Sequence, residues 1–283
     1  TAAQQLPEFS AQRFVVTGCS KRGMASWISS AADDRVIGAF PTCFNAGNFN
    51  EFFKLKAERW GLDYLPNLAP DKMKASVNNV KVTNAPAFIS PRQQIKLFAE
   101  HPFAEKLASI QDPYHFRHLI KGKKILYSTG TNDPLFPVGS DTVLLPHMPA
   151  SVQIQLVANA RHTAASNEQE ISWPMWLAHT FAGRQLTQLD VSSEVKGDEL
   201  MVSVNTQSAH KIKVVRLWHA ADQVGSYLQA KWQAVEMSHL GAGRYQAKLF
   251  IDDPYIGYFI EVEDLDAESL PGLITSGFQE YRH

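Results

Sequence analysis

The chain has 283 residues, with 27 Lys or Arg against 28 Asp or Glu, so its formal net charge is −1. This near-neutral balance argues against a protein that binds nucleic acid or another polyanion. Hydrophobic residues make up 45% of the chain and charged residues 19%, as in a globular protein with a sizeable core, and the length predicts two domains. The sequence has no uncharged apolar run of about 18 residues and no signal-peptide pattern at its start, so neither a transmembrane helix nor a leader is predicted.

From residue 13 to about residue 183, short apolar runs alternate with helix-like stretches, which predicts βαβ units around a parallel sheet. Strands are expected at residues 14–17, 36–40, 125–129 and 152–158. The last of these alternates like a half-exposed edge strand. Helices are expected at residues 24–32, 93–100, 103–110 and 168–182, on both faces of the sheet. The sequence therefore predicts an α/β domain over residues 1–183.

Beyond residue 184 the apolar residues follow a period of two. Runs at residues 200–204, 245–251 and 256–262 alternate in this way, and residues 211–218 form a less regular one. Short strands separated by turns, without helices, indicate an antiparallel β-sandwich over residues 184–283.

The first predicted strand ends in Gly18-Cys19-Ser20-Lys21-Arg22-Gly23 and leads directly into a predicted helix, the context of a nucleophile elbow. In such a turn the serine hydroxyl stands above the sheet edge, and the amide of Lys21 points to where an oxyanion would develop. The second glycine comes one position later than in the common Gly-x-Ser-x-Gly spacing, and Arg22 stands where a small residue is usual. The alternative is a strand-to-helix turn in which Ser20 only caps the helix.

A serine nucleophile needs a histidine base and an acid that orients the histidine. Asp133 follows the third predicted strand and His162 follows the fourth. The order Ser, acid, His, each at the C-terminal end of a different strand, is that of α/β-hydrolases. We therefore predict a triad of Ser20, Asp133 and His162. Asp112 is a rival acid, but its place before a proline and an apparent helix indicates an N-cap.

Neighbours of the triad are candidate substrate contacts, namely Arg22, Asn132 and Asn159. The basic pair Lys21-Arg22 either contacts a substrate carboxylate or forms a structural ion pair with Asp33 or Asp34. Residues 45–111 are a candidate lid. Its aromatic side chains, which could equally belong to an ordinary core, are Phe49, Phe52, Phe53, Trp60, Tyr64 and Phe88.

Cysteines and histidines offer weaker alternatives. Cys19 could be mistaken for the nucleophile, but a side chain just before the elbow is expected to point into the sheet. A disulfide between Cys19 and Cys43 is neither required nor excluded. His115 and His118 have an i, i+3 spacing but no evident third ligand, so we predict no metal site.

Several segments of the chain resemble the PhoPQ-activated pathogenicity-related proteins, a family of the α/β-hydrolase superfamily. They are Ser20-Lys21-Arg22-Gly23, Trp27, Asp33-Asp34-Arg35-Val36, Asp112-Pro113-Tyr114, Asn132-Asp133-Pro134-Leu135-Phe136, Asn159, His162 and Leu217-Trp218. The resemblance implies that Ser20, Asp133 and His162 are a hydrolase triad and that the protein is virulence-related and periplasmic or secreted. Gly18-Cys19-Ser20 also resembles the elbow of glucuronoyl methylesterases. We rank this family second among the resemblances.

The leading hypothesis is a serine hydrolase that acts on an ester or amide of a small molecule or peptide without metal or organic cofactor. The alternatives are a secreted signalling or adhesion protein on a hydrolase scaffold, suggested by a proliferation repressor among the family's relatives, a peptidase, and a carbohydrate esterase. An α/β-hydrolase normally has about four strands before its nucleophile. We therefore expect residues 1–183 to be the C-terminal part of such a fold, with an N-terminal portion preceding Thr1.

Overall fold

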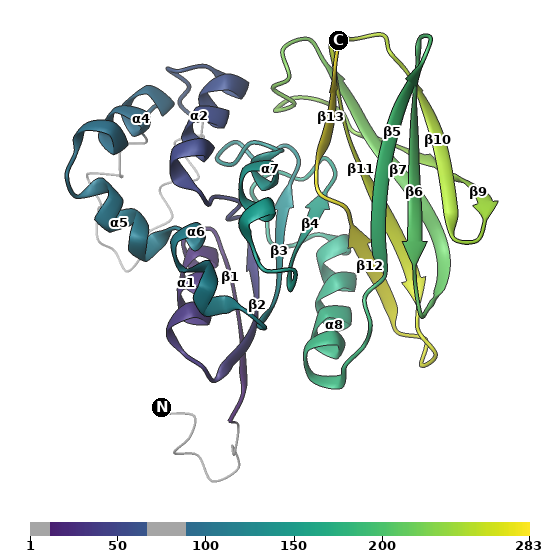
Figure 1. Ribbon diagram of the computed structural model, residues 1–283, viewed down its shortest axis with the longest axis horizontal. Coiled ribbons are helices and arrows are strands. Elements are labelled where there is room, and N and C mark those ends of the chain that lie inside the picture. Colours follow the sequence, from purple (N-terminus) through teal and green to yellow (C-terminus); the bar gives the residue numbers. More distant parts are fainter. Residues whose placement is uncertain (1–11, 67–88) are drawn as a thin grey trace, which may run out of the picture.

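The computed structural model describes residues 12–66 and 89–283. Its first part is a parallel sheet in the order β1-β2-β3-β4 (Figure 1). The strands are β1 (Phe14–Cys19), β2 (Val36–Thr42), β3 (Lys124–Gly130) and β4 (Val152–Val157). All four predicted strands are therefore present and parallel, with bounds that differ by at most two residues.

Helices join these strands, and two of them cover opposite faces of the sheet. They are α1 (Lys21–Ala32), α2 (Phe49–Trp60), α4 (Pro91–Glu100), α5 (Ala104–Gln111), α6 (Pro113–Phe116), α7 (Ser140–Leu144) and α8 (Asn167–Ala182), with 3₁₀ helices at Arg117–Ile120 and Leu145–His147. Trp27 of α1 contacts Tyr127 on one face, while Trp176 of α8 packs with Leu126 on the other. Neighbouring strand residues point to opposite faces, so a single strand supports both helices.

The C-terminal part consists of two antiparallel sheets. One has the order β5-β6-β10-β9, and the other β12-β11-β7-β8 with β13 also paired to β11. The strands are β5 (Gln188–Lys196), β6 (Glu199–Gln207), β7 (Lys211–Asp222), β8 (Gln233–Glu236), β9 (Ser238–Gly241), β10 (Arg244–Phe250), β11 (Tyr255–Leu265), β12 (Pro271–Thr275) and β13 (Gln279–Arg282). Val202 of β6, Leu217 of β7 and Ile260 of β11 are completely buried in one core shared by the two sheets. The predicted antiparallel C-terminal part is therefore confirmed.

The expectation that β4 is a half-exposed strand is wrong, although β4 is the last strand of its sheet. Five of its six residues are buried. Thr275 of β12 accepts a hydrogen bond from the Leu156 amide at 2.9 Å and donates one to the Ile154 carbonyl at 3.2 Å. The C-terminal part thus covers the free edge of the parallel sheet, which the pattern of β4 alone could not reveal.

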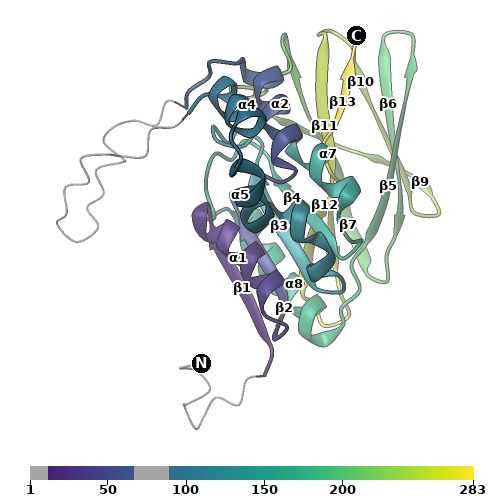
Figure 2. The same ribbon diagram turned by 60° about the vertical axis from the view of Figure 1, so that its left-hand side comes forward.

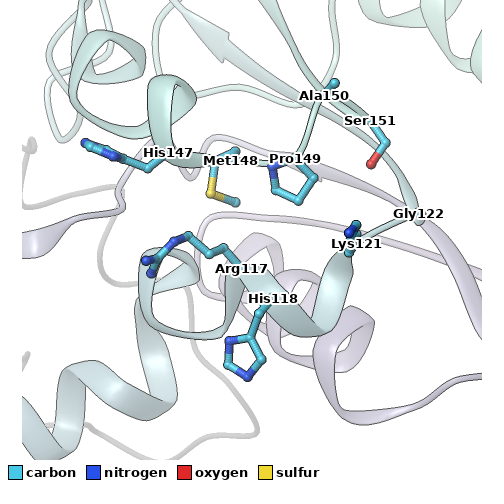
Figure 3. Close-up of a pocket in the computed structure, with 9 residues that line it drawn as sticks. All are labelled: Arg117, His118, Lys121, Gly122, His147, Met148, Pro149, Ala150 and Ser151. Carbon is cyan, nitrogen blue, oxygen red and sulfur yellow. The ribbon is translucent and has the colours of Figure 1, made fainter.

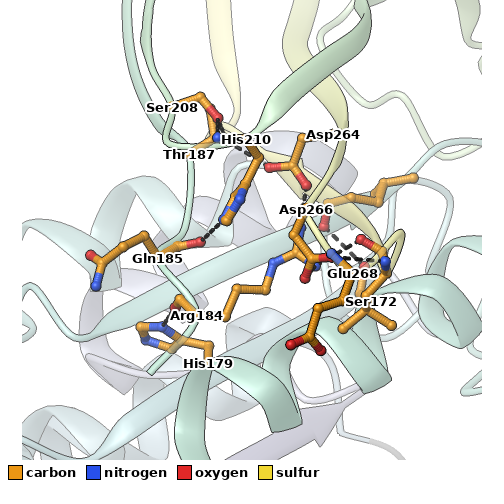
Figure 4. A network of polar contacts seen from close by, with 12 residues as sticks. Ser172, His179, Arg184, Gln185, Thr187, Ser208, His210, Asp264, Asp266 and Glu268 are labelled. Atoms are coloured by element: carbon orange, nitrogen blue, oxygen red, sulfur yellow. Dashed lines mark hydrogen bonds and ion pairs between the residues drawn. The ribbon is translucent and has the colours of Figure 1, made fainter. Parts of the chain in front are cut away.

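A buried polar network attaches the segment that follows α8 to the C-terminal sheets (Figure 4). The guanidinium of Arg184 donates to the carboxylate of Asp264 and, at 3.1 Å, to that of Asp266. Thr187 donates to the second carboxylate oxygen of Asp264 at 2.7 Å. The division into two domains remains a prediction, because the largest core cluster contains residues of both parts, among them Tyr127 and Phe259.

Candidate active site

Ser20 occupies the turn between β1 and α1 in a conformation that L-residues rarely adopt, with φ 59° and ψ −119°. The turn is held by a hydrogen bond from the Ser20 amide to the Thr42 carbonyl at 2.9 Å, and the Ser20 carbonyl accepts from the Met24 amide at 3.0 Å. Although Ser20 stands at the N-cap position, its side chain makes no capping hydrogen bond. The alternative reading of Ser20 as a helix cap is therefore not supported, and the strained backbone is that expected of a nucleophile elbow.

The two glycines of the elbow allow this tight turn. A Cβ on Gly18 would lie 2.5 Å from the Cβ of Arg22. Arg22, which stands where the common motif has a small residue, therefore packs directly against Gly18. A Cβ on Gly23 would lie 2.7 Å from the Thr42 carbonyl oxygen. The later glycine thus lets α1 approach the end of β2, which explains the shifted spacing.

Asp133 and His162 are joined directly. The Oδ2 atom of Asp133 lies 2.8 Å from Nδ1 of His162, and Oδ1 accepts from the amides of Leu135 at 2.8 Å and Phe136 at 3.3 Å. Asp133 is buried, with 1% of its surface exposed. This arrangement places a proton on Nδ1 and leaves Nε2 of His162 as the acceptor.

The two loops that carry this pair approach each other closely. A Cβ on Gly130 would lie 2.2 Å from the Ala160 carbonyl oxygen, and the Asn132 amide donates to the same oxygen at 3.0 Å. The elbow lies near these loops, since Gly18 and Cys19 line a pocket of about 260 Å³ together with Ala164. Among the described residues, Ser20 Oγ has no hydrogen-bond partner, so the contact between Ser20 and His162 is not formed in this structure.

The side chains of Asn132 and Asn159, two predicted substrate contacts, bind the backbone of the C-terminal part. Asn132 Nδ2 donates to the carbonyls of Tyr227, Leu228 and Ala230 at 3.2, 3.3 and 2.8 Å. Asn159 exchanges two hydrogen bonds with the backbone of Trp232. Both amides therefore attach residues 227–232 to the loops of Asp133 and His162.

Charged side chains near the elbow do not form the structural ion pairs considered from the sequence. Asp33 pairs with Arg35 at 2.6 Å, and Asp34 lies 3.9 Å from Lys123. Neither Lys21 nor Arg22 has an ion-pair partner among the described residues, and both are exposed. Asp112, the rival acid, caps α6 through the Tyr114 amide and also accepts from the amides of Asn48 and Phe49, as expected of a residue that supports the fold.

Helix α2 lies at the end of the sheet where the parallel strands terminate (Figures 1 and 2). The ring of Phe52 lies 6.0 Å from that of Phe136, which stacks on His162 at 5.9 Å. Tyr64, just after α2, donates to the Pro134 carbonyl at 3.0 Å. Two of the aromatic side chains expected in a lid, Phe52 and Tyr64, thus contact the loop from Asp133 to Phe136, called the acid loop below. The other described ones, Phe49, Phe53 and Trp60, pack against aromatic neighbours, and Phe88 lies outside the described residues.

Lys56, on the buried face of α2, was not singled out from the sequence. The residue is 7% exposed, and its Nζ lies 5.6 Å from the centre of the Trp60 ring. Burial lowers the pKa of Lys56 to about 8, and the nearby charge of Asp133 opposes this change. Only the fold could reveal its burial, because a lysine in a helix is normally exposed.

Both cysteines are free thiols. Cys43 is buried, which raises the pKa of its thiol, and a hydrogen bond with the thiol of Cys19 raises it further. Within the described ranges, no group of three or more His, Cys, Asp or Glu side chains could hold a metal ion. Likewise, no helix in those ranges is long and apolar enough to span a bilayer.

A larger pocket of about 470 Å³ lies elsewhere (Figure 3). Its lining comes from residues just before β3 and β4, including Arg117, Lys121 and His147. It is therefore at the opposite end of the strands from Asp133 and His162. Ligands of open parallel sheets bind at the carboxyl ends of the strands, so this pocket is not the candidate active site.

A sequence model of the family described as PhoPQ-activated pathogenicity-related protein matches residues 1–225. The chain belongs to this family. No curated protein gives a significant match.

Several solved structures are similar in part. Acetyl xylan esterase 1 from Thermoanaerobacterium is 16% identical with a TM-score of 0.37, covering 62% of this chain and 48% of that one. An esterase from Pyrococcus furiosus is 15% identical with a TM-score of 0.36, covering 64% and 56%. This PhoPQ-related chain thus spans about half the length of each esterase. A β-1,3-glucan-binding module of family 56 is 18% identical with a TM-score of 0.25, covering 34% and 99%.

Proposed function

We propose that this PhoPQ-related protein is a serine hydrolase that cleaves an ester or amide of a small molecule or peptide. The observation that carries the proposal is the 2.8 Å contact between buried Asp133 and His162 Nδ1, together with the strained elbow at Ser20. Each of these features is uncommon in a purely structural loop. Both come from ends of strands in one parallel sheet, where their side chains can converge.

In this mechanism Ser20 Oγ attacks the acyl carbonyl carbon, and Nε2 of His162 takes the hydroxyl proton. The C–O or C–N bond to the leaving group then breaks, with the proton passing from His162 to the leaving atom. Water, activated by the same nitrogen, hydrolyses the acyl-enzyme. Asp133 holds the imidazole in the required tautomer and stabilises the imidazolium.

The developing oxyanion would be bound by the amide of Lys21. Lys21 is the first residue of α1, and an amide at this position has no partner within its own helix. The positive end of the helix dipole favours negative charge at the same point. Arg22 would lie at the rim of the site, where its exposed guanidinium can meet a substrate.

The test is steady-state hydrolysis of 4-nitrophenyl esters of increasing chain length by the wild type and Ser20→Ala. The proposal expects a measurable kcat/KM that falls by at least about 10³-fold in Ser20→Ala, because removal of a nucleophile leaves only residual catalysis. Asp112→Asn is the matched control, since this carboxylate supports the fold. Equal loss in both variants, or hydrolysis unaffected by Ser20→Ala, would refute the proposal.

A further inference from the structure

Positive charge gathers around the candidate site of a chain whose net charge is −1. Lys21 and Arg22 follow Ser20, Arg161 precedes His162, and Lys56 faces the acid loop. None of these four has a carboxylate partner among the described residues. A concave site lined by one sign of charge raises the local concentration of ligands of the opposite sign.

Lys56 is the unusual member of this group, because it is buried. It shares one face of α2 with Phe52, one turn earlier, whose ring contacts Phe136 beside His162. One turn later on α2 comes Trp60, whose ring lies 4.6 Å from that of Tyr64 in a tilted arrangement. Contacts on both sides therefore hold the stem of Lys56 over the loop of Asp133 to Phe136.

Within the described residues the Lys56 ammonium lies over the Trp60 ring but has no carboxylate partner, and a largely buried cation is stabilised further by one. The nearest acid does not offer one, since both oxygens of Asp133 are already taken by His162 and two backbone amides. The pKa of Tyr64 responds to the same charges: burial raises it, the carboxylate of Asp133 raises it further, and Arg161 lowers it. Arg161 thus lies close enough to Tyr64 to form the outer side of the same positively charged region.

We propose that Lys56 is a specificity-determining residue that binds a carboxylate of the substrate, with Arg161 as a secondary contact. This inference rests on the proposed hydrolase function and narrows its substrate class to acyl esters or amides whose acyl part carries a negative charge. Binding of the anion adds a carboxylate to the Trp60 ring as a partner of the ammonium. The exposed side chains of Lys21 and Arg22 add attraction at longer range.

The experiment compares two activated esters of similar size, the mono-4-nitrophenyl ester of succinic acid and 4-nitrophenyl butyrate. Wild-type kcat/KM should be at least about tenfold higher for the charged ester, and this preference should fall as ionic strength rises. Lys56→Met should lower kcat/KM for the charged ester about tenfold or more while changing the neutral ester less than about twofold. Lys56→Arg should keep most of the preference.

Lys211→Met is the matched control, because Lys211 is exposed at the start of β7. Lys211 lies about 35 Å from residue 222, which is at the other end of this strand and near α2. Lys211 is therefore far from Lys56. The control should leave both rates unchanged. Succinate itself gives a second readout, since it should raise the melting temperature of the wild type but not of Lys56→Met.

The inference would be overturned by a wild type without preference for the charged ester, or by a preference that survives in Lys56→Met. Absence of both turnover and stabilisation by succinate would also overturn it. Hydrolysis of the charged ester that depends on Ser20 but not on Lys56 would refute this inference while leaving the hydrolase proposal intact. Failure of Ser20→Ala to lower any activity would refute the hydrolase proposal instead.

Discussion

Asn159 and Trp232 are joined by both polar groups of the asparagine side chain. Oδ1 accepts from the Trp232 amide at 2.8 Å, and Nδ2 donates to the Trp232 carbonyl at 3.0 Å. Thr131 links this contact to the acid loop, because its hydroxyl accepts from the Asn159 amide and donates to Asn132 Oδ1. A segment of the C-terminal part is thereby attached to the loops of both Asp133 and His162.

Asn159→Gly tests whether this attachment positions the histidine. Glycine tolerates the left-handed backbone of Asn159, φ 59°, so the change removes the two hydrogen bonds without adding backbone strain. We expect the free energy of unfolding to fall by about 1–3 kcal/mol. We expect kcat to fall about tenfold or more with little change in KM, because small misplacements of catalytic groups are costly. Ester hydrolysis and denaturant unfolding measure the two effects.

Thr187→Val is the control for this prediction. Thr187 is also buried, in the segment between α8 and β5, where its hydroxyl bonds to Ser208 and Asp264 (Figure 4). It follows the far end of α8, a helix of 16 residues and thus about 24 Å long. The valine variant should lose similar stability and keep its kcat. Equal loss of kcat in the two variants would mean that Asn159 acts only through stability.

Gly130→Ala should prevent the close approach of the loop that carries Asp133 to the loop that carries His162. The added methyl would lie 2.2 Å from the Ala160 carbonyl oxygen, far inside van der Waals contact, and the atoms in its way are backbone. We expect a loss of roughly 2–3 kcal/mol in stability from overpacking, and loss of Ser20-dependent activity in the fraction that remains folded. Gly197→Ala, which meets nothing within 4 Å but has a φ of 66°, is the comparison for a glycine-to-alanine change that costs backbone strain without a clash. Wild-type activity in folded Gly130→Ala would contradict the assignment of these loops.

The parallel strands and the proximity of Asp133 to His162 could be predicted from the sequence because their signals are local. Short β-branched runs end at turns, and Asp133 and His162 each follow such a run. The partners of Asn132 and Asn159 could not be predicted, since residues 227–232 lie more than 70 positions further along the chain. For the same reason the sequence pattern predicted β4 to be half-exposed, whereas β12, which is distant in the sequence, covers β4 in the folded chain.

Asp141→Asn should stabilise the protein in a pH-dependent way. Burial raises the pKa of Asp141 from 3.8 to about 6, so the folded state holds this proton more tightly than the unfolded state. The charged carboxylate therefore destabilises the fold above about pH 6 and not below about pH 4. Asparagine keeps the acceptor for the Phe278 amide, a 2.7 Å contact of Asp141. The gain should approach roughly 3 kcal/mol at pH 7 and shrink toward pH 4.

Urea unfolding of both proteins between pH 4 and pH 7 measures this gain. The Asp141→Asn advantage must rise with pH across that interval. A constant advantage, or one that grows toward acid pH, would show that Asp141 is not a buried acid with a raised pKa.

The most direct test of the account is labelling by a fluorophosphonate, which reacts only with an activated serine. Intact mass followed by peptide mapping should show one adduct on Ser20 in the wild type. Ser20→Ala should show none, and His162→Ala should label at least about 10²-fold more slowly, because the hydroxyl then lacks its base. No adduct on Ser20, or labelling at the wild-type rate in His162→Ala, would contradict the proposed triad.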